Sequence, residues 1–263
     1  MRRWSFFVYG VFCHLLFLAT YAYLVCFVGN FLVPKTLDST PGSSPFDVAI
    51  NLTLLALFGL QHSIMARPWF KQVWTRLIPE PIERSTYCLF SCLVLFLLMW
   101  QWRGQSAIIW NVEHPLGRGL LWALFAVGWL TVPTVSLMIN HFDLFGTRQV
   151  WLYLRGRPYT SLPFRTPMLY NRIRHPLYVG FALAFWATPT MTLGHLIFSG
   201  AMTLYMAIAT RIEERDLVNH YGDKYRAYQR RVGMYIPRFG GGDETAVQPV
   251  ATGSAVYVET VAK

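Results

Sequence analysis

Charged residues are scarce in this chain. Asp, Glu, Lys and Arg make up 14% of its 263 residues, whereas an ordinary soluble domain contains roughly 25%. So few charges exclude a disordered protein and a coiled coil, both of which are rich in charged residues. Hydrophobic residues reach 54% and occur in long runs, which predicts an integral membrane protein.

Cysteine is also scarce, and its positions argue against disulfide bonds. All four cysteines lie inside apolar runs, where cysteine packs as a small hydrophobic residue. The sequence also lacks metal-binding spacings such as His-Glu-x-x-His, a Gly-x-Ser-x-Gly nucleophile turn and a phosphate-binding glycine loop. We therefore expect neither a disulfide-stapled secreted domain nor a metal site. The cysteines are Cys13, Cys26, Cys88 and Cys92.

Acidic residues are outnumbered, with 13 Asp and Glu against 23 Lys and Arg and a net charge of +10. A basic balance raises the question of nucleic-acid binding. The basic residues, however, cluster between apolar spans, where membrane topology explains them. We expect a lipid bilayer as a partner and no nucleic acid, and the oligomeric state stays open.

Four apolar runs are long enough to cross a membrane, because a span needs about 20 apolar residues. A fifth region, 176–212, is too long for one span and contains Pro189 and Gly194, which break helices. This region is predicted to form a helical hairpin. The fold class expected is all-α, a polytopic membrane bundle of five to six helices. Its first four spans are 5–33, 46–66, 87–102 and 119–139.

The distribution of basic residues predicts the orientation in the membrane. We assign the N-terminus, the loops 67–86 and 140–175 and the C-terminal tail to the cytoplasm. Only three of the 23 Lys and Arg, Lys35, Arg103 and Arg118, then lie on the opposite side. Cytoplasmic loops carry such an excess of Lys and Arg. Both termini are expected in the cytoplasm, and the membrane is expected to be a bacterial inner membrane.

The densest group of polar residues that look out of place begins the hairpin. Arg174 and His175 precede Pro176, which suits the first turn of a helix. They therefore stand at a positive helix N-terminus, where a carboxylate or phosphate binds. Tyr178 can offer its ring to a cation, and Gly180 allows close approach of a ligand. The alternative is an interfacial Arg and Tyr anchor beside a span.

Two adjacent carboxylates, Glu213 and Glu214, follow the other arm of the hairpin. By themselves they fit an amphipathic cytoplasmic helix with salt bridges. The hairpin, however, brings them near Arg174, His175 and Tyr178. Cationic, aromatic and anionic groups then converge, which suits a zwitterionic ligand with an additional positive centre.

Polar residues also mark the cytoplasmic ends of the second and fourth spans. His62 and His141 are candidate proton acceptors, and Asp143 is a candidate to orient a neighbouring histidine. Ionisable residues at membrane depth are costly and usually functional. A single histidine near a helix end is otherwise a structural residue, and this alternative stays open for each of the two.

The residues of the hairpin form an ordered motif. It consists of Arg174-His175-Pro176-x-Tyr178-x-Gly180, then Glu213-Glu214, then Gly222-x-x-Tyr225-x-x-Tyr228. In order and spacing this motif resembles the isoprenylcysteine carboxyl methyltransferase-like membrane methyltransferases over roughly 170–238. The resemblance implies that the hairpin binds S-adenosylmethionine through the motif residues Arg174, His175, Tyr178, Gly180, Glu213 and Glu214.

A second resemblance extends over most of the chain. Segments 58–63, 65–68, 83–87 and 140–146 look like bacterial enzymes of this family that methylate a small thiol. It implies S-adenosylmethionine-dependent conversion of methanethiol to dimethyl sulfide. The alternatives are methylation of a lipid or a prenylated cysteine, or a small transporter or sensor that uses the same residues as a proton relay.

A thiol needs help to ionise, because its pKa is about 8.5 or higher. Under the methyltransferase interpretation His141 is the first candidate for the base, with Asp143 orienting it, and His62 is the second. The chain then divides into transmembrane helices 1–145, a cofactor-binding unit of loop, hairpin and cytoplasmic helix 146–238, and a tail 239–263. The tail is predicted to be disordered, because it lacks apolar periodicity.

Overall fold

The structure is a computed structural model that describes residues 1–39, 41–42, 44–160, 162 and 165–238. Within these residues, five helices are long and apolar enough to cross a membrane, and a shorter apolar helix accompanies them. The predicted polytopic helical bundle is therefore confirmed. The tail 239–263, predicted to be disordered, lies outside the described residues.

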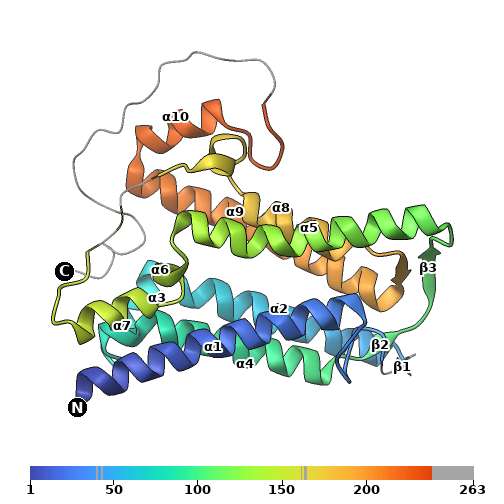
Figure 1. Ribbon diagram of the computed structural model, residues 1–263, viewed down its shortest axis with the longest axis horizontal. Coiled ribbons are helices and arrows are strands. Elements are labelled where there is room, and N and C mark those ends of the chain that lie inside the picture. The colour runs from blue at the N-terminus through green and yellow to red at the C-terminus, as the bar shows by residue number, and fades with distance from the viewer. Residues whose placement is uncertain (40, 43, 161, 163–164, 239–263) are drawn as a thin grey trace.

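Helices make up most of the chain, and the strands between them are short (Figure 1). In chain order the elements are α1 (Arg2–Gly29), β1 (Pro41–Gly42), α2 (Pro45–Met65), α3 (Pro68–Trp74), the 3-10 helix η1 (Glu80–Ile82), α4 (Glu83–Gln101), β2 (Gly104–Gln105), β3 (Ile108–Asn111), α5 (Pro115–Ile139), α6 (His141–Leu144), α7 (Thr147–Leu154), the 3-10 helix η2 (Met168–Asn171), α8 (Pro176–Trp186), β4 (Thr190–Thr192), α9 (Leu193–Tyr221) and α10 (Asp223–Arg231).

The long helices form two layers. Helix α4 packs against α1 and α2 in one layer, and α5 packs against α8 in the other (Figure 1). Helix α9 connects the layers, because it contacts both α2 and α8. Buried aromatic side chains such as Phe27, Trp102, Phe185 and Phe198 fill the space between the layers.

Several of the predicted span boundaries differ from the structure; the fourth span, for example, begins at Pro115 rather than residue 119. The first helix ends at Gly29 rather than continuing to residue 33, because Asn30 takes the left-handed conformation that ends helices. The third begins at Glu83 rather than residue 87. Its first turn holds a charged side chain, Arg84, which is buried and paired with Asp143.

The predicted break in the fifth region is confirmed. Helix α8 ends at Trp186 and α9 begins at Leu193, after β4 has paired antiparallel with β3. The Thr192 side chain caps α9 by accepting a hydrogen bond from the backbone of His195. At Gly194, a Cβ atom would lie 2.9 Å from the backbone nitrogen of Gln105. The turn of the hairpin is thus held by strand pairing and by close backbone packing.

The first arm of the hairpin lies along α5, and two glycines make this contact possible. A Cβ atom on Gly128 would lie 2.5 Å from the backbone nitrogen of Ala184, and one on Gly180 would lie 3.0 Å from the side chain of Thr131. Within a lipid bilayer the hydrophobic effect does not drive helices together, and close packing takes its place. Small residues allow this close packing.

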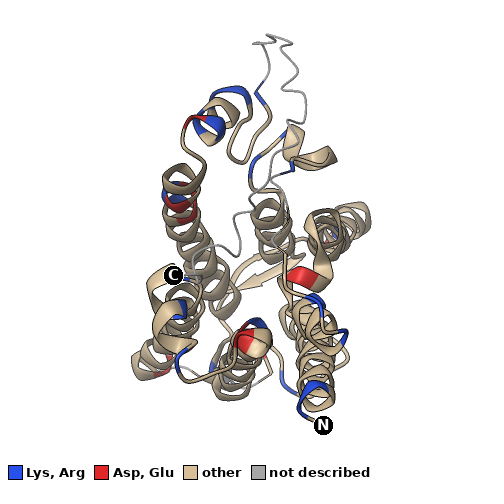
Figure 2. Ribbon diagram, turned by 90° about the vertical axis from the view of Figure 1, so that its left-hand side faces the viewer, with Lys and Arg blue, Asp and Glu red and all other residues tan. Residues whose placement is uncertain are grey.

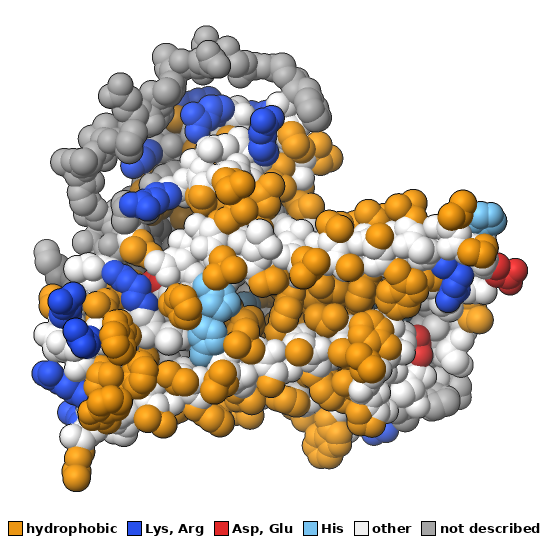
Figure 3. All heavy atoms as spheres, in the orientation of Figure 1, with side chains coloured by type: hydrophobic (Ala, Val, Ile, Leu, Met, Phe, Trp, Pro, Cys, Tyr) orange, Lys and Arg blue, Asp and Glu red, His pale blue; other side chains and the backbone are white. Residues whose placement is uncertain are grey.

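The polar elements gather at one end of the bundle. The N-terminus, α7, the beginning of α8 and α10 lie at this end, on the left of Figure 1. Figure 2 looks onto the same end and shows Lys and Arg on these elements. Hydrophobic side chains cover the sides of the long helices in Figure 3, with basic side chains mainly beyond them at that end. This distribution agrees with the positive side predicted from the sequence.

Candidate functional site

The polar end of the hairpin is held by backbone hydrogen bonds to the segment that follows α10. The backbone N–H of Arg174 donates to the carbonyl of Gly233 at 2.8 Å, and that of His175 donates to Met234 at 3.1 Å. A parallel bridge joins Ile173 to Gly233. The chain after α10 therefore fixes the two residues that begin α8.

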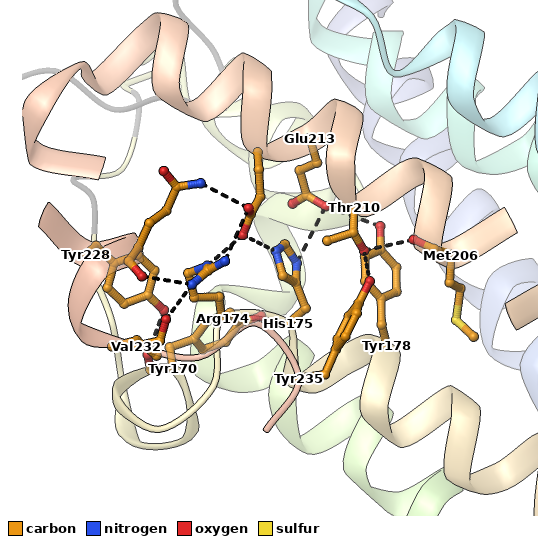
Figure 4. Close-up of polar contacts among 12 residues, drawn as sticks. Tyr170, Arg174, His175, Tyr178, Met206, Thr210, Glu213, Tyr228, Val232 and Tyr235 are labelled. Carbon is orange, nitrogen blue, oxygen red and sulfur yellow. Dashed lines mark hydrogen bonds and ion pairs between the residues drawn. The ribbon is translucent and has the colours of Figure 1, made fainter. Parts of the chain in front are cut away.

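Arg174 and Glu214 form a buried ion pair between the two arms (Figure 4). Nε of Arg174 donates to Oε1 of Glu214 at 2.6 Å, and Nη2 donates to Oε2 at 3.3 Å. Nη1 donates to the carbonyl oxygens of Gln229 and Val232. The Gln229 amide also donates to Oε2 of Glu214, at 2.9 Å. Such two-point pairing fixes geometry as well as charge.

His175 connects the two carboxylates. Its Nε2 lies 3.0 Å from Oε1 of Glu214, and its Nδ1 lies 4.0 Å from Oε2 of Glu213. The Tyr178 phenol donates to the same Glu213 oxygen at 3.2 Å, and its ring stacks on the imidazole (Figure 4). Five of the predicted cofactor residues are thus brought together, as the hairpin argument required.

Buried and half-buried tyrosines surround this cluster. Tyr228 of α10 donates to the carbonyl of Tyr170 at 2.6 Å, and Tyr235 donates to Thr210 of α9 at 2.9 Å. Burial raises the pKa of both Tyr170 and Tyr228. Both phenols therefore stay protonated at neutral pH, and that of Tyr228 acts as a hydrogen-bond donor.

A polar groove of about 400 Å³ lies between α9 and α10 on the other side of Glu214. Small-molecule sites usually have volumes of about 300–1,000 Å³. Its lining offers both positive and negative groups. The residues are Arg211, Glu214, Arg215, Val218, Asn219 and Gln229.

Gly180, the sixth predicted cofactor residue, lies apart from the others. It is buried against α5, where the carbonyl of Gly128 and the side chain of Thr131 are its close neighbours. The close approach that this glycine permits is therefore between two helices.

His141 has neighbours that the sequence did not reveal. Its Nδ1 lies 2.5 Å from the Ser136 hydroxyl, and its Nε2 lies 3.0 Å from Nε2 of His14 in α1. The other ring nitrogen of His14 lies 2.7 Å from the Thr147 hydroxyl. Burial lowers the pKa of His141. This histidine is therefore neutral at neutral pH and is oriented by Ser136 and His14.

Asp143 was expected to orient His141, and this expectation was wrong. Its buried carboxylate instead accepts hydrogen bonds from Arg84 at 3.1 Å, from Arg148 at 3.0 Å and from Tyr159 at 3.0 Å. Burial is the main cause that raises the pKa of Tyr159 to about 12. Residues two apart on a helix do not face each other, and two arginines compete for this carboxylate. Asp143 joins α4 to the segment after α5.

His62, the third candidate for proton transfer, lies between α2 and α4. Its Nδ1 is 3.2 Å from the Ser91 hydroxyl, and its Nε2 is 2.9 Å from the Tyr87 phenol. The ring also stacks on Phe58, and Phe58 makes an edge contact with Tyr205 of α9.

Sequence reasoning missed several residues at these sites, among them His14, Gln229 and Tyr205. His14 is a single polar residue in an apolar helix, a signal that was available. Gln229 follows Tyr225 by one helical turn, on the α10 face that packs against α9. Tyr205 is one aromatic among many in this chain and carries no sequence signal of its own.

Comparison with known proteins identifies relatives over nearly the whole chain. The family model described as NnrU protein matches residues 51–261. A methanethiol S-methyltransferase of Mycobacterium tuberculosis is 50% identical over 90% of this chain and 98% of its own length. One from Crocosphaera subtropica is 50% identical over 89% of this chain and 92% of its own. Nurim of Xenopus laevis is 32% identical over 70% of this chain and 68% of its own. No solved structure matches.

Proposed function

Because this chain belongs to the NnrU family, together with the methanethiol S-methyltransferases, we propose that it transfers a methyl group from S-adenosylmethionine to a small thiol. The acceptor proposed is methanethiol, and the product is dimethyl sulfide. The observation that carries the proposal is the cluster at the end of the hairpin, where Arg174, His175, Tyr178, Glu213 and Glu214 converge.

The donor set of this cluster fits the cofactor. S-adenosylmethionine carries a carboxylate, an ammonium group and a sulfonium cation, and it supplies a methyl group that is already activated. The Glu213 side chain, 28% exposed, offers a carboxylate beside the Tyr178 ring. Arg211 and Arg215 of the adjacent groove offer positive charge for a carboxylate.

Glu214 has a different part in the proposal. Its carboxylate already accepts hydrogen bonds from Arg174, His175 and Gln229. We assign Arg174 and His175 to holding this carboxylate in place at the edge of the groove. Glu213, Tyr178 and the groove then make the contacts with the cofactor.

The protein must also align the thiol and remove its proton, since alignment alone supplies a large part of the rate. We move the role of proton acceptor from His141 to His62. His141 is paired with His14 of α1. His62, in contrast, is joined through Phe58 to Tyr205 of α9, the helix that carries Glu213.

We further propose that the protein lies in a bacterial inner membrane with both termini in the cytoplasm. Support comes from the five apolar helices and from the basic elements at one end of the bundle (Figure 2). The cluster lies at this same end, where a water-soluble cofactor has access to it. A small apolar thiol can reach the helices from the hydrocarbon phase.

The test uses purified full-length protein in lipid nanodiscs. Calorimetry measures S-adenosylmethionine binding, and headspace analysis measures dimethyl sulfide formed from methanethiol. Binding together with product formation is the expected result. Binding with methylation of a lipid or a prenylated cysteine, but not of methanethiol, would replace the proposed acceptor. No binding at all would favour a transporter or sensor.

A further inference from the structure

His62, Ser91 and Tyr87 form a closed ring of hydrogen bonds that fixes the tautomer of the histidine. The Ser91 hydroxyl donates its only hydrogen to the backbone carbonyl of Tyr87, at 3.0 Å. We therefore assign Nδ1 of His62 as the donor in its 3.2 Å contact with the Ser91 oxygen. A neutral imidazole has one N–H, so Nε2 is an acceptor. The Tyr87 phenol lies 2.9 Å from Nε2 and 3.3 Å from the backbone carbonyl of His62, and we assign its hydrogen to the closer acceptor, Nε2.

The α2 segment beside this ring of hydrogen bonds contacts α9, the helix that carries Glu213 and Glu214. Ser63, which follows His62, donates to the Tyr205 phenol at 3.4 Å. The Tyr205 ring covers Gly59, where a Cβ atom would lie 2.9 Å from it. Helix α9 thus packs directly on the segment of α2 that carries His62.

Tyr87 lies against the His62 ring, with the two ring centroids 5.1 Å apart. The His62 ring stacks on Phe58, and Phe58 contacts Tyr205 of α9. Tyr87 keeps part of its surface accessible, although its neighbours in the first turns of α4 are buried. Its oxygen donates one hydrogen bond to His62 and keeps its capacity to accept another.

We propose that Tyr87 is a catalytic residue that passes the thiol proton to His62, an inference that rests on the proposed methyl transfer. The thiol S–H bond breaks as its proton binds the phenol oxygen, and the phenol's own proton moves to Nε2 of His62. The freed electron pair on sulfur forms the bond to the donor methyl group as the methyl–sulfonium bond breaks. After product release, the imidazolium returns the proton to water by the reverse path.

Ser91 is a positioning residue in this proposal. It keeps the hydrogen of the neutral imidazole on Nδ1, so that Nε2 is free to receive a proton. Once the imidazole is protonated, both N–H groups have acceptors, Ser91 and Tyr87. In Ser91→Ala the hydrogen can move to Nε2, which then no longer accepts, and turnover falls.

The experiment compares Tyr87→Phe with the parent and with Tyr9→Phe. Tyr9 is a matched control, because its phenol bonds the hydroxyl of the adjacent α4 residue, Thr86, at 3.0 Å. We measure cofactor affinity, thermal unfolding, and turnover with methanethiol between pH 6 and 10. Turnover is also measured with an aromatic thiol that is already ionised at neutral pH.

The expected result is specific to proton transfer. Tyr87→Phe should lower methanethiol turnover at neutral pH by about 10²–10⁴-fold, the usual contribution of a proton-transfer group. The loss should shrink at high pH and with the ionised thiol, while cofactor affinity and unfolding match those of Tyr9→Phe. Equal losses for both thiols at every pH, or no loss, would overturn the inference. If the parent itself neither binds S-adenosylmethionine nor forms product, the proposed function fails instead.

Discussion

Arg174 and Glu214 are 40 residues apart in the chain, yet Nε and Nη2 of the arginine bond both carboxylate oxygens of the glutamate. The pair joins the start of α8 to the C-terminal part of α9. It therefore closes the hairpin at the end opposite its turn, and it sets the positions of the residues proposed to bind the cofactor.

The first prediction concerns the stability of this pair. Arg174→Ala leaves a buried carboxylate without its main partner, which typically costs about 3–5 kcal/mol. We expect a clear fall in the thermal unfolding temperature in nanodiscs. Arg226→Ala is the control, because its ion pair with Asp223 is exposed and exposed pairs contribute little. Similar unfolding temperatures for the two variants would contradict the assigned role of Arg174.

The second prediction separates cofactor binding from folding. Glu213→Gln removes a partly exposed negative charge beside Tyr178. Losing a charge-assisted hydrogen bond costs roughly 1.5–3 kcal/mol, so affinity for S-adenosylmethionine should fall about tenfold to a hundredfold with little change in unfolding. Calorimetry measures this change, and the exposed Glu80→Gln at the same end is the control. Unchanged affinity in Glu213→Gln would show that the cofactor does not bind at this carboxylate.

A third prediction follows from the lowered pKa of His141. Between the usual histidine pKa of 6.5 and its lower value in the folded protein, the unfolded chain binds more protons than the folded one. Stability should therefore be full above about pH 6.5 and decrease as the pH falls below it. His141→Gln should flatten this dependence, as measured by unfolding between pH 5 and 7.5. An identical pH dependence in parent and variant would show that His141 does not contribute.

The fourth prediction tests the packing of the hairpin arm on α5. Gly128→Ala places a Cβ atom 2.5 Å from the backbone of Ala184, so the two helices must separate. Gly119→Ala, on the same helix, meets nothing within 4 Å and should be neutral or stabilising by up to about 1 kcal/mol. We expect lower unfolding temperature and lower turnover for the first variant only. Comparable behaviour of both would mean that α8 does not depend on this contact.

The fifth prediction concerns orientation. A reporter that is active only in the cytoplasm should be active when it is fused after Arg238. A reporter that is active only in the periplasm should be active when it is inserted near Lys35. The basic end of the bundle provides the physical reason. An active periplasmic reporter after Arg238 would reverse the proposed topology.

The sequence predicted the elements of the fold better than their packing. Pro189 and Gly194 located the break in the hairpin, because both residues act on the local backbone. The partner of α8 was not predictable in this way. Gly128 and Gly180 lie at the contact because neither has a side chain that would hold the two helices apart. The hydropathy of the sequence does not show which glycines of two helices will lie against each other.

The same distinction applies to the candidate site. The predicted hairpin placed Arg174, His175 and Glu214 together, because a hairpin returns the end of its second arm to the start of its first. Asp143 was assigned to His141 from proximity in the chain alone. Arg84, distant in sequence, binds that carboxylate instead, and only the packing of α4 beside α6 reveals it.

The segment after α10 holds Arg174 and His175 through the carbonyl groups of Val232, Gly233 and Met234. Every residue type has such a carbonyl. Replacing Val232 or Met234 by alanine would therefore leave these acceptors in place, and an alanine scan would rate the segment as unimportant for the site. Shortening the chain before Val232 removes all of them at once. A segment that tolerates changes of side chain can thus still be required for its backbone. Truncation detects that requirement, and alanine substitution does not.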